Sequence, residues 1–324
     1  MSGPLLEVED LSVRFDTDEG SVHAVDRMSL SLEPRQVLGV VGESGCGKSV
    51  TALSIVGLLP KTAKVTGSVR FEGLELLAAS KSELRRVRGR QISFVFQEPM
   101  TSLNPVFRVG HQIEEVLREH MNLSRAAARQ RVVELLDLVH IPDPARRAEE
   151  YPHQLSGGMR QRVMIAMALG CDPKILIADE PTTALDVTIQ AGILDLLREL
   201  RDRLGTAIVL ITHNLGVVAD IADRVVVMYA GRKAEEAPVG ELFAHPQHPY
   251  TIGLLGAVPR AGAAARNGRL QEIPGRVPSL SELPTHCAFA DRCPRADEQS
   301  WSEVPVLRQV RPDHAVACFH PGEQ

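Results

Sequence analysis

The sequence lacks three features that would indicate a membrane-spanning, secreted or nucleic-acid-binding protein. No apolar run approaches the roughly 18 to 20 residues that a membrane-spanning helix needs, and the longest, Val37–Val41 and Ala207–Ile211, have the length of buried strands. The N-terminal stretch MSGPLLEVEDLSV lacks the basic start and apolar centre of a secretory signal. Lys and Arg number 36 against 41 Asp and Glu, so the net charge of -5 provides no broad basic surface. We expect a soluble, cytosolic chain that does not bind nucleic acid.

Cysteine is scarce as well, with five residues in 324. Cys46 and Cys171 stand alone, whereas Cys287, Cys293 and Cys318 gather near the C-terminus. In a reducing compartment such a set is not expected to form a disulfide framework. Hydrophobic residues make up 44% and charged residues 24% of the chain, which is ordinary globular usage and supplies a sizeable core. The length fits one large domain with an appendage, or two domains.

The hydrophobic pattern predicts an α/β fold. Between Leu5 and Glu33 apolar and polar residues alternate, which indicates an antiparallel sheet with one wet face. Near-continuous apolar runs of strand length, each beside a helical pattern, then indicate parallel strands buried on both faces. These runs are Val37–Val41, Ile92–Phe96, Ile175–Ala178 and Ala207–Ile211.

Two further segments depart from this pattern. Helical periodicity in His111–Met121 and Arg125–Ile141 predicts a helical insertion between the second and third apolar runs. From Pro259 to Gln324 prolines recur with little periodicity, which predicts an irregular appendage held by something other than a large core.

The segment Gly42–Ser49 reads GESGCGKS and satisfies the P-loop pattern, between an apolar strand and a helical stretch. In such a loop the backbone N–H groups surround a phosphate, Lys48 reaches the β- and γ-phosphates, and Ser49 offers its hydroxyl to Mg²⁺. The alternative is a Gly-rich turn without a ligand.

Polar residues end the other apolar runs. Asp179 and Glu180 follow one run, while Gln97 and His213 close two others. Ligands bind beyond the carboxyl ends of parallel strands, so these groups are expected to converge on one nucleotide. Asp179 and Gln97 would serve the metal, Glu180 would activate water, and His213 would contact the γ-phosphate. Taken singly, each is also compatible with a solvated strand end.

A second Gly-rich turn, Leu155–Met159 (LSGGM), opens another helix and is a second candidate anion site. Because one P-loop already surrounds the triphosphate, this turn makes sense if it contacts the nucleotide of another subunit. The alternative is a capped helix start with Ser156 as the N-cap.

The P-loop, Gln97, LSGGM, ILIADE, the loop Ala184–Asp186 and His213, in this order, resemble the ATP-binding subunit of an ABC transporter over residues 5 to 235. The resemblance implies an α/β P-loop NTPase core with an N-terminal antiparallel β subdomain, an inserted helical subdomain and an irregular C-terminal appendage. It also implies an ATPase in which two subunits close head to tail on two ATP molecules.

Site roles follow from the resemblance. The implied catalytic residues are Lys48, Gln97, Glu180 and His213, and the implied Mg²⁺ ligands are Ser49, Gln97 and Asp179. Ser156 and Gly158 would face the γ-phosphate held by the other subunit, Asp186 would line the dimer seam, and Phe15 would stack on adenine unless it is only a core residue. The implied nucleotide-binding residues are Phe15, Gly42, Glu43, Ser44, Gly45, Cys46, Gly47, Lys48, Ser49, Val50, Ser156, Gly157, Gly158 and Asp186.

Finer features are similar to the dipeptide/oligopeptide importer branch. They are Gln97–Pro105 (QEPMTSLNP), the stretch YPHQLSGGMRQR, His245–Thr251 and Ile273–Leu280. The branch implies an ATP-binding domain over 1–240, with a helical subdomain at about 98–165, and a C-terminal domain over 241–324, which we call the appendage.

The branch also implies partners. These are two membrane permeases, a second, identical or homologous ABC ATPase and, indirectly, an extracytoplasmic solute-binding protein, with the chain peripheral on the cytoplasmic face of the inner membrane. The implied cargo is a di- or oligopeptide. Alternatives are nickel or another small solute, or an ABC ATPase without a transport role, which the single cassette and the lack of a long heptad repeat disfavour.

In this branch the tail commonly holds four cysteines associated with a 4Fe–4S cluster. Here Cys287, Cys293 and Cys318 are present, and Ser300 stands where the remaining cysteine is expected. Cluster sites ordinarily use four thiolates, so a complete set requires His286, His314, His320 or Ser300 as a substitute. Structural thiols, a three-cysteine cluster and a zinc site remain alternatives.

Overall fold

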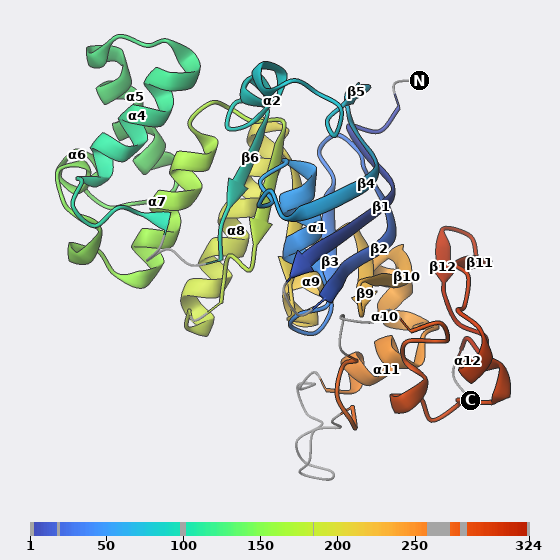
Figure 1. The fold of residues 1–324 in the computed structure, drawn as a ribbon. Coiled ribbons are helices and arrows are strands. Elements are labelled where there is room, and N and C mark those ends of the chain that lie inside the picture. Colours follow the sequence, from blue (N-terminus) through green and yellow to red (C-terminus); the bar gives the residue numbers. More distant parts are fainter. Residues whose placement is uncertain are drawn as a thin grey trace. The chain divides into compact units, whose positions relative to one another are not determined.

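The computed structural model describes residues 3–17, 20–97, 102–183, 185–257, 273–278 and 284–322. They form two compact units, each described here by itself. The first unit contains Met1–Leu32, Val37–Ala78 and Ile211–Gln324, and the second contains Glu33–Gln36 and Ala79–Leu210. Both mix helices and strands, as the sequence predicts (Figure 1).

The first unit begins with an antiparallel sheet in the order β2-β1-β4-β5. Its strands are β1 (Leu6–Thr17), β2 (Gly20–Leu32), β4 (Ala63–Phe71) and β5 (Leu74–Glu75). They are drawn in blue to teal in Figure 1. Leu6, Val8, Leu11 and Val13 of β1 are buried while residues between them are more exposed, which is the period of a strand with one wet face. The expected antiparallel sheet is therefore confirmed, although β4 was not anticipated.

A second sheet in this unit is built on β3 (Val37–Val41), which is buried along its whole length and runs parallel to β9 (Arg224–Tyr229). Strand β10 (Arg232–Pro238) pairs antiparallel with β9, β12 (His314–Val316) pairs with β10, and β11 (Arg308–Arg311) pairs with β12. The C-terminal strands thus extend the sheet that carries the P-loop. The accompanying helices are α1 (Lys48–Ile55), α9 (Leu215–Ile221) and α10 (Val239–Ala244).

The appendage contains short elements, and its residues Tyr250 and Phe289 form an aromatic cluster with Tyr229 of β9. Ring centroids lie 4.6 Å apart for the two tyrosines, 5.2 Å for Tyr229 and Phe289, and 5.6 Å for Tyr250 and Phe289. These residues give the appendage a small buried centre in place of a large core. Its elements are α11 (Pro249–Gly256), η3 (Ala290–Arg292), α12 (Glu298–Ser302) and the strands β11 and β12.

The second unit combines parallel strands with the helical insertion. Strand β6 (Ile92–Val95) runs parallel to β7 (Ile175–Asp179), which confirms two of the expected buried strands. Strand β8 (Ala207–Thr212) starts in this unit and carries the chain into the first. The insertion appears as green ribbons in Figure 1, where α4, α5 and α6 pack on one another and α4 and α5 also contact α7. The helices of the second unit are α2 (Lys81–Val87), α4 (Val109–Met121), α5 (Arg125–Leu138), α6 (Pro144–Ala148), η1 (Pro152–Gln154), α7 (Gly157–Leu169) and α8 (Val187–Leu204).

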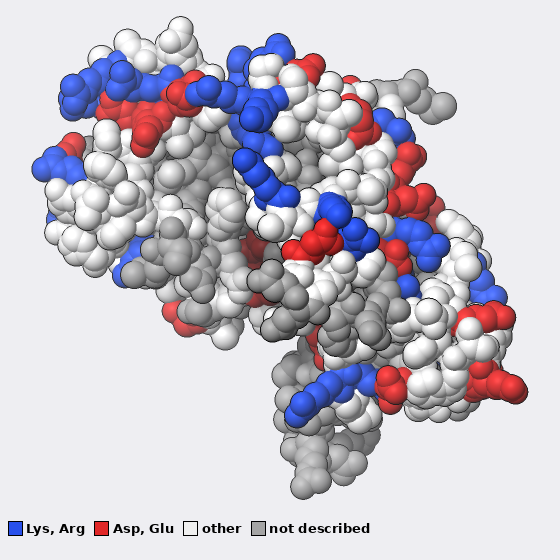
Figure 2. Space-filling model, in the orientation of Figure 1, with Lys and Arg blue, Asp and Glu red and all other residues white. Residues whose placement is uncertain are grey.

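Basic and acidic side chains lie intermixed on the face of the molecule that Figure 2 shows. This agrees with the nearly balanced charge of the sequence. Among the residues that the structure describes, none of the helices combines the length and the apolar character needed to cross a bilayer.

Candidate active site

The P-loop connects β3 to α1 in the first unit. Gly42 has φ 157°, and a Cβ there would lie 2.3 Å from the carbonyl oxygen of Met228. Gly47 has φ 101° and caps α1, and a Cβ there would lie 2.4 Å from the carbonyl oxygen of Ala24. Only glycine fits these two positions, because the backbone is left-handed at Gly47 and other backbone approaches closely at both. The loop thus turns tightly between β3 and α1, and its role in binding phosphate remains a prediction.

Lys48 occupies the first position of α1, and its side chain folds back over the loop. Its Nζ donates hydrogen bonds to the carbonyl oxygens of Gly42 at 2.8 Å and Glu43 at 3.0 Å. Ser49 and Val50 follow in the first turn of α1, where the helix N-terminus favours an anion. This combination of a buried ammonium, tight backbone and helix start fits a polyphosphate.

The other loop positions divide into exposed and buried ones. Ser44 and Gly45 are exposed, while Cys46 is buried. Burial raises the pKa of the Cys46 thiol, so this cysteine fills space in the loop and is not an activated nucleophile.

Two further residues expected at the nucleotide belong to the first unit. Phe15 is half-buried in β1, opposite Val22 of β2 and Ala63 of β4. His213 follows β8 and is exposed. A role for Phe15 at adenine and for His213 at the γ-phosphate remains a prediction.

The second unit brings Gln97 and Glu180 together. Asp179 is buried at the end of β7, and Glu180 follows in a left-handed backbone conformation with φ 47°. Gln97 Nε2 donates to Glu180 Oε2 at 3.3 Å, and Thr183 Oγ1 donates to the same oxygen at 2.7 Å. Thr183 was not identified from the sequence, although it stands three residues after Glu180. Two of the expected polar strand ends thus meet.

The turn Leu155–Met159 is a capped helix start, as one of the two sequence interpretations expected. Ser156 accepts a hydrogen bond from the backbone N–H of Met159 at 3.3 Å and is exposed at the N-cap of α7. A Cβ at Gly158 would lie 2.7 Å from Cγ2 of Ile189, so this glycine permits close packing on α8.

Asp186 caps α8 in the same way, accepting from the N–H of Ile189 at 2.9 Å, and it is exposed. Ala184, which precedes it in the expected loop, lies outside the described residues. Two exposed N-caps, Ser156 and Asp186, therefore flank the contact of α7 with α8. Gly157 lies near Leu185, since a Cβ on this glycine would be 3.8 Å from the leucine Cδ2.

The three C-terminal cysteines supply one thiolate fewer than the four that an iron–sulfur cluster ordinarily uses. Burial raises the pKa of the thiols of Cys287, Cys293 and Cys318, the last to about 11. Ser300, the expected substitute, donates its hydroxyl to Asp297 at 2.8 Å. In the described ranges no group of three or more His, Cys, Asp or Glu side chains is arranged to hold a metal ion.

The histidines offered as substitute ligands are partnered elsewhere. His314 Nε2 lies 2.6 Å from Glu235, and His320 Nε2 lies 2.9 Å from Asp297. His286 stacks near Trp301, with ring centroids 5.5 Å apart. The expectation of a 4Fe–4S or zinc site therefore finds no support in this arrangement.

Comparison with known proteins assigns the family. The ABC transporter family model matches residues 25–183, and the model for the oligopeptide/dipeptide transporter C-terminal region matches residues 234–299. A probable peptide ABC transporter ATP-binding protein of Sinorhizobium fredii is 54% identical over 98% of this chain and 96% of its own length. The chain belongs to the ATP-binding subunits of ABC transporters, in the oligopeptide/dipeptide branch.

Other similar proteins agree with this assignment. The oligopeptide transport ATP-binding protein OppD of Escherichia coli is 52% identical over 99% of this chain and 94% of its length. A solved dimeric ATP-binding cassette, in a post-hydrolysis state with ADP and Pi, matches with a TM-score of 0.65 and 29% identity. That match covers 72% of this chain and 98% of the cassette. This ABC subunit is an ATPase with a P-loop NTPase core.

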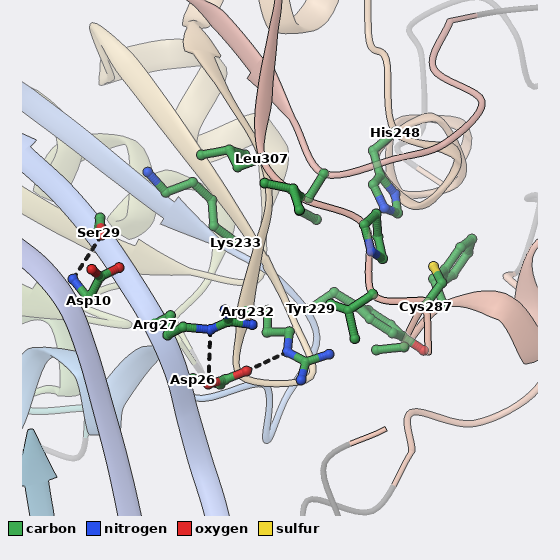
Figure 3. Close-up of a pocket in the computed structure, with 17 residues that line it drawn as sticks. Asp10, Asp26, Arg27, Ser29, Tyr229, Arg232, Lys233, His248, Cys287 and Leu307 are labelled. Atoms are coloured by element: carbon green, nitrogen blue, oxygen red, sulfur yellow. Dashed lines mark hydrogen bonds and ion pairs between the residues drawn. The ribbon is translucent and has the colours of Figure 1, made fainter. Parts of the chain in front are cut away.

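Among the described residues, two of the cavities outside the P-loop of this ABC ATPase are each lined by residues of a single unit. One, of about 470 Å³, is in the first unit, where Tyr229, His248 and Cys287 face it (Figure 3). Asp26 forms ion pairs there with Arg232 at 2.7 Å and Arg27 at 3.6 Å, so both guanidinium groups are partnered. The other, of about 860 Å³, is in the second unit and is lined by residues of α4 together with Asn104, Phe107 and Met167.

Proposed function

We propose that this chain is the ATP-hydrolysing subunit of an ABC importer that takes up di- or oligopeptides. The observation that carries the proposal is the near-full-length similarity to peptide-transport ATP-binding proteins, which includes the C-terminal region typical of that branch. The P-loop geometry and the Gln97–Glu180 contact support the ATPase part, because they supply a phosphate cradle and a positioned carboxylate.

In the proposed reaction the P-loop and the start of α1 bind the triphosphate, and Lys48 stabilises charge on the β- and γ-phosphates. Glu180 accepts a proton from the attacking water, and Gln97 holds the Glu180 carboxylate in position. His213 contacts the γ-phosphate and stabilises the charge that develops there.

Ser49, Gln97 and Asp179 would hold Mg²⁺, since hydroxyl, amide and carboxylate oxygens are ligands that this hard cation prefers. When bound, the ion neutralises charge on the phosphate oxygens. Asp179 is 6% exposed at the end of β7, which suits a carboxylate that is fixed in place.

We further propose that two ATPase subunits close on the nucleotide. Ser156 and Gly158 would contact the γ-phosphate bound by the other subunit, Asp186 would line the seam, and Phe15 would stack on adenine. The exposure of Ser156 and Asp186 supports an intermolecular role for both.

The proposed partners are two permeases, with the chain peripheral on the cytoplasmic face of the membrane and a solute-binding protein acting indirectly. The groove of about 860 Å³ along α4 is the proposed seat of a permease helix, next to exposed Phe107. The proposed permease site also includes the segment Gln97–Asn104, of which residues 98–101 lie outside the described residues. The domain boundaries at 1–240 and 241–324 and the helical subdomain at about 98–165 are part of this proposal.

Replacing Glu180 with Gln tests the catalytic assignment. The substitution keeps the shape and removes the base, so ATP binding should persist while the hydrolysis rate falls by roughly 100-fold or more. Glu199→Gln is the control. Glu199 lies on α8 and pairs with Arg203 and His140, whereas Glu180 accepts from Gln97. A Glu180→Gln enzyme that hydrolyses ATP at the wild-type rate would refute the role of Glu180.

A further inference from the structure

A buried arginine of the appendage forms a salt bridge with a residue of the P-loop. Arg292 lies at the end of η3, and its side chain is 3% exposed. Its Nη1 donates to Oε2 of Glu43 at 2.7 Å, and its Nη2 donates to Oε1 at 3.0 Å. Glu43 is the second residue of the P-loop, 249 positions earlier in the chain. This bidentate geometry is the strong form of an arginine–carboxylate pair.

The remaining donors of Arg292 are also used. Nε donates to the carbonyl oxygen of Pro274 at 2.9 Å, Nη2 to that of Ile273 at 3.2 Å, and Nη1 to the hydroxyl of Tyr229 at 3.4 Å. A guanidinium has five N–H groups, and each of them has an acceptor here. The side chain therefore has one well-defined position, in which it ties Glu43 to the appendage and to β9.

The backbone of Glu43 is held by the appendage as well. Its N–H donates to the hydroxyl of Tyr250 at 2.8 Å, and Tyr250 is completely buried at the start of α11. The carbonyl of the same residue accepts from Lys48 Nζ at 3.0 Å. A shift of Glu43 would thus move one of the two carbonyl oxygens that hold the phosphate-binding ammonium.

The surroundings of Arg292 hold it in place. Its guanidinium carbon lies 5.8 Å from the ring centroid of Tyr229 and 5.9 Å from that of Phe289, within cation–π range. Gly275 has φ 82°, and a Cβ there would lie 3.1 Å from Cγ of Arg292, so the described segment 273–278 packs closely on the arginine stem. Tyr229 and Phe289 also line the cavity of about 470 Å³ in Figure 3.

We propose that Arg292 is a positioning residue of the P-loop, through which the appendage sets the affinity of this ATPase for ATP. The appendage then does more than extend the sheet: its aromatic cluster and the segment 273–278 hold Glu43, and Glu43 holds Lys48. The inference rests on the proposed use of the P-loop for ATP. The two failures can be distinguished. ATP binding by the wild-type protein tests the proposed function, whereas the variants test the role of Arg292.

The test compares Arg292→Gln, Glu43→Gln and the double variant in the full-length ATPase, with KM for ATP, kcat and the melting temperature measured for each. We expect each single variant to raise KM at least about five-fold, with the change in KM larger than any change in kcat. The double variant should be no worse than the worse single one, since both remove the same interaction.

Arg311→Gln is the matched control, because Arg311 forms an exposed Arg–Glu pair with Glu241 in the appendage, at 3.1 Å. It should leave KM unchanged. Additive effects in the double variant, an unchanged KM in Arg292→Gln, or an equal increase in Arg311→Gln would each overturn the proposal. A wild-type protein that does not bind ATP would instead contradict the proposed function.

Tyr250→Phe provides a second route if Arg292→Gln does not fold. It removes only the hydroxyl that accepts from the N–H of Glu43 and keeps the buried ring. A melting temperature near wild type with a raised KM would support the proposal. A KM equal to that of the wild type in this folded variant would contradict it.

Discussion

Among single residues, His248 gives the appendage a defined pH dependence. It is buried at the N-cap of α11, where its Nδ1 accepts a hydrogen bond from the N–H of Tyr250 at 3.0 Å. Burial lowers the pKa of this imidazole to about 4 from an ordinary 6.5, against a smaller opposing effect of Glu235. The neutral ring is thus the form that the fold requires.

The sign of the effect follows from these two pKa values. Below pH 6.5 the unfolded chain binds a proton at His248 that the folded chain does not, so the free energy of unfolding falls as the pH drops toward 4. The loss contributed by this group is on the order of 3 kcal/mol.

His248→Asn should remove this part of the pH dependence while retaining a side-chain acceptor for the N–H of Tyr250. The measurement is the free energy of unfolding of both proteins between pH 7.5 and pH 4.5. His111→Asn is the control, since His111 is exposed on α4. Parallel pH curves for wild type and His248→Asn would contradict the assignment.

The residues that the sequence identified were those whose signal is local. The P-loop glycines and Lys48 follow one another along the chain, so their spacing alone predicts the cradle. Glu43 was expected only as a loop residue, because its partner Arg292 is 249 positions away and no local pattern links the two. The contact of Gln97 with Glu180, 83 positions apart, follows instead from the expectation that the polar ends of parallel strands converge.

Among secondary-structure elements, a comparison of α7 with α5 distinguishes the capping role of Ser156 from its proposed intermolecular role. Ser156 and Ser124 are both exposed N-caps whose hydroxyl oxygens accept a backbone N–H at 3.3 Å, in α7 and α5 respectively. Arginine at either position removes a cap worth about 1 kcal/mol. We expect only Ser156→Arg to abolish ATP-dependent association of the ATPase subunits.

Sedimentation of the Glu180→Gln protein, with and without Ser156→Arg, measures this association in the presence of Mg²⁺ and ATP. Glu180→Gln with Ser124→Arg serves as the control and should still associate. If the Ser156→Arg form associates as strongly as the control, the intermolecular role of Ser156 is contradicted and only its capping role remains.

Element prediction succeeded where a strand or helix has its own hydrophobic period. The runs at β3, β6, β7 and β8 and the helices α4 and α5 were anticipated because their patterns are strong. Strand β9 was not anticipated, although Val225–Met228 is apolar and buried. Its place beside β3 is a pairing across about 185 residues, and register over such a distance is decided by tertiary packing.

In the molecule as a whole, the appendage is joined to the ATPase by two kinds of contact. Strand β12 extends the P-loop sheet through β10, and Arg292 and Tyr250 hold Glu43. The three cysteines contribute half-buried thiols with raised pKa values to the same region. These contacts hold the described residues of the proline-rich tail against the rest of the first unit.

The most direct test is uptake of a labelled peptide into vesicles that contain this full-length subunit with its permeases and partner ATPase. We predict uptake that requires Mg²⁺ and ATP with the wild-type chain and is lost with Glu180→Gln. Uptake that proceeds without ATP, or a wild-type assembly that neither hydrolyses ATP nor imports peptide, would contradict the account.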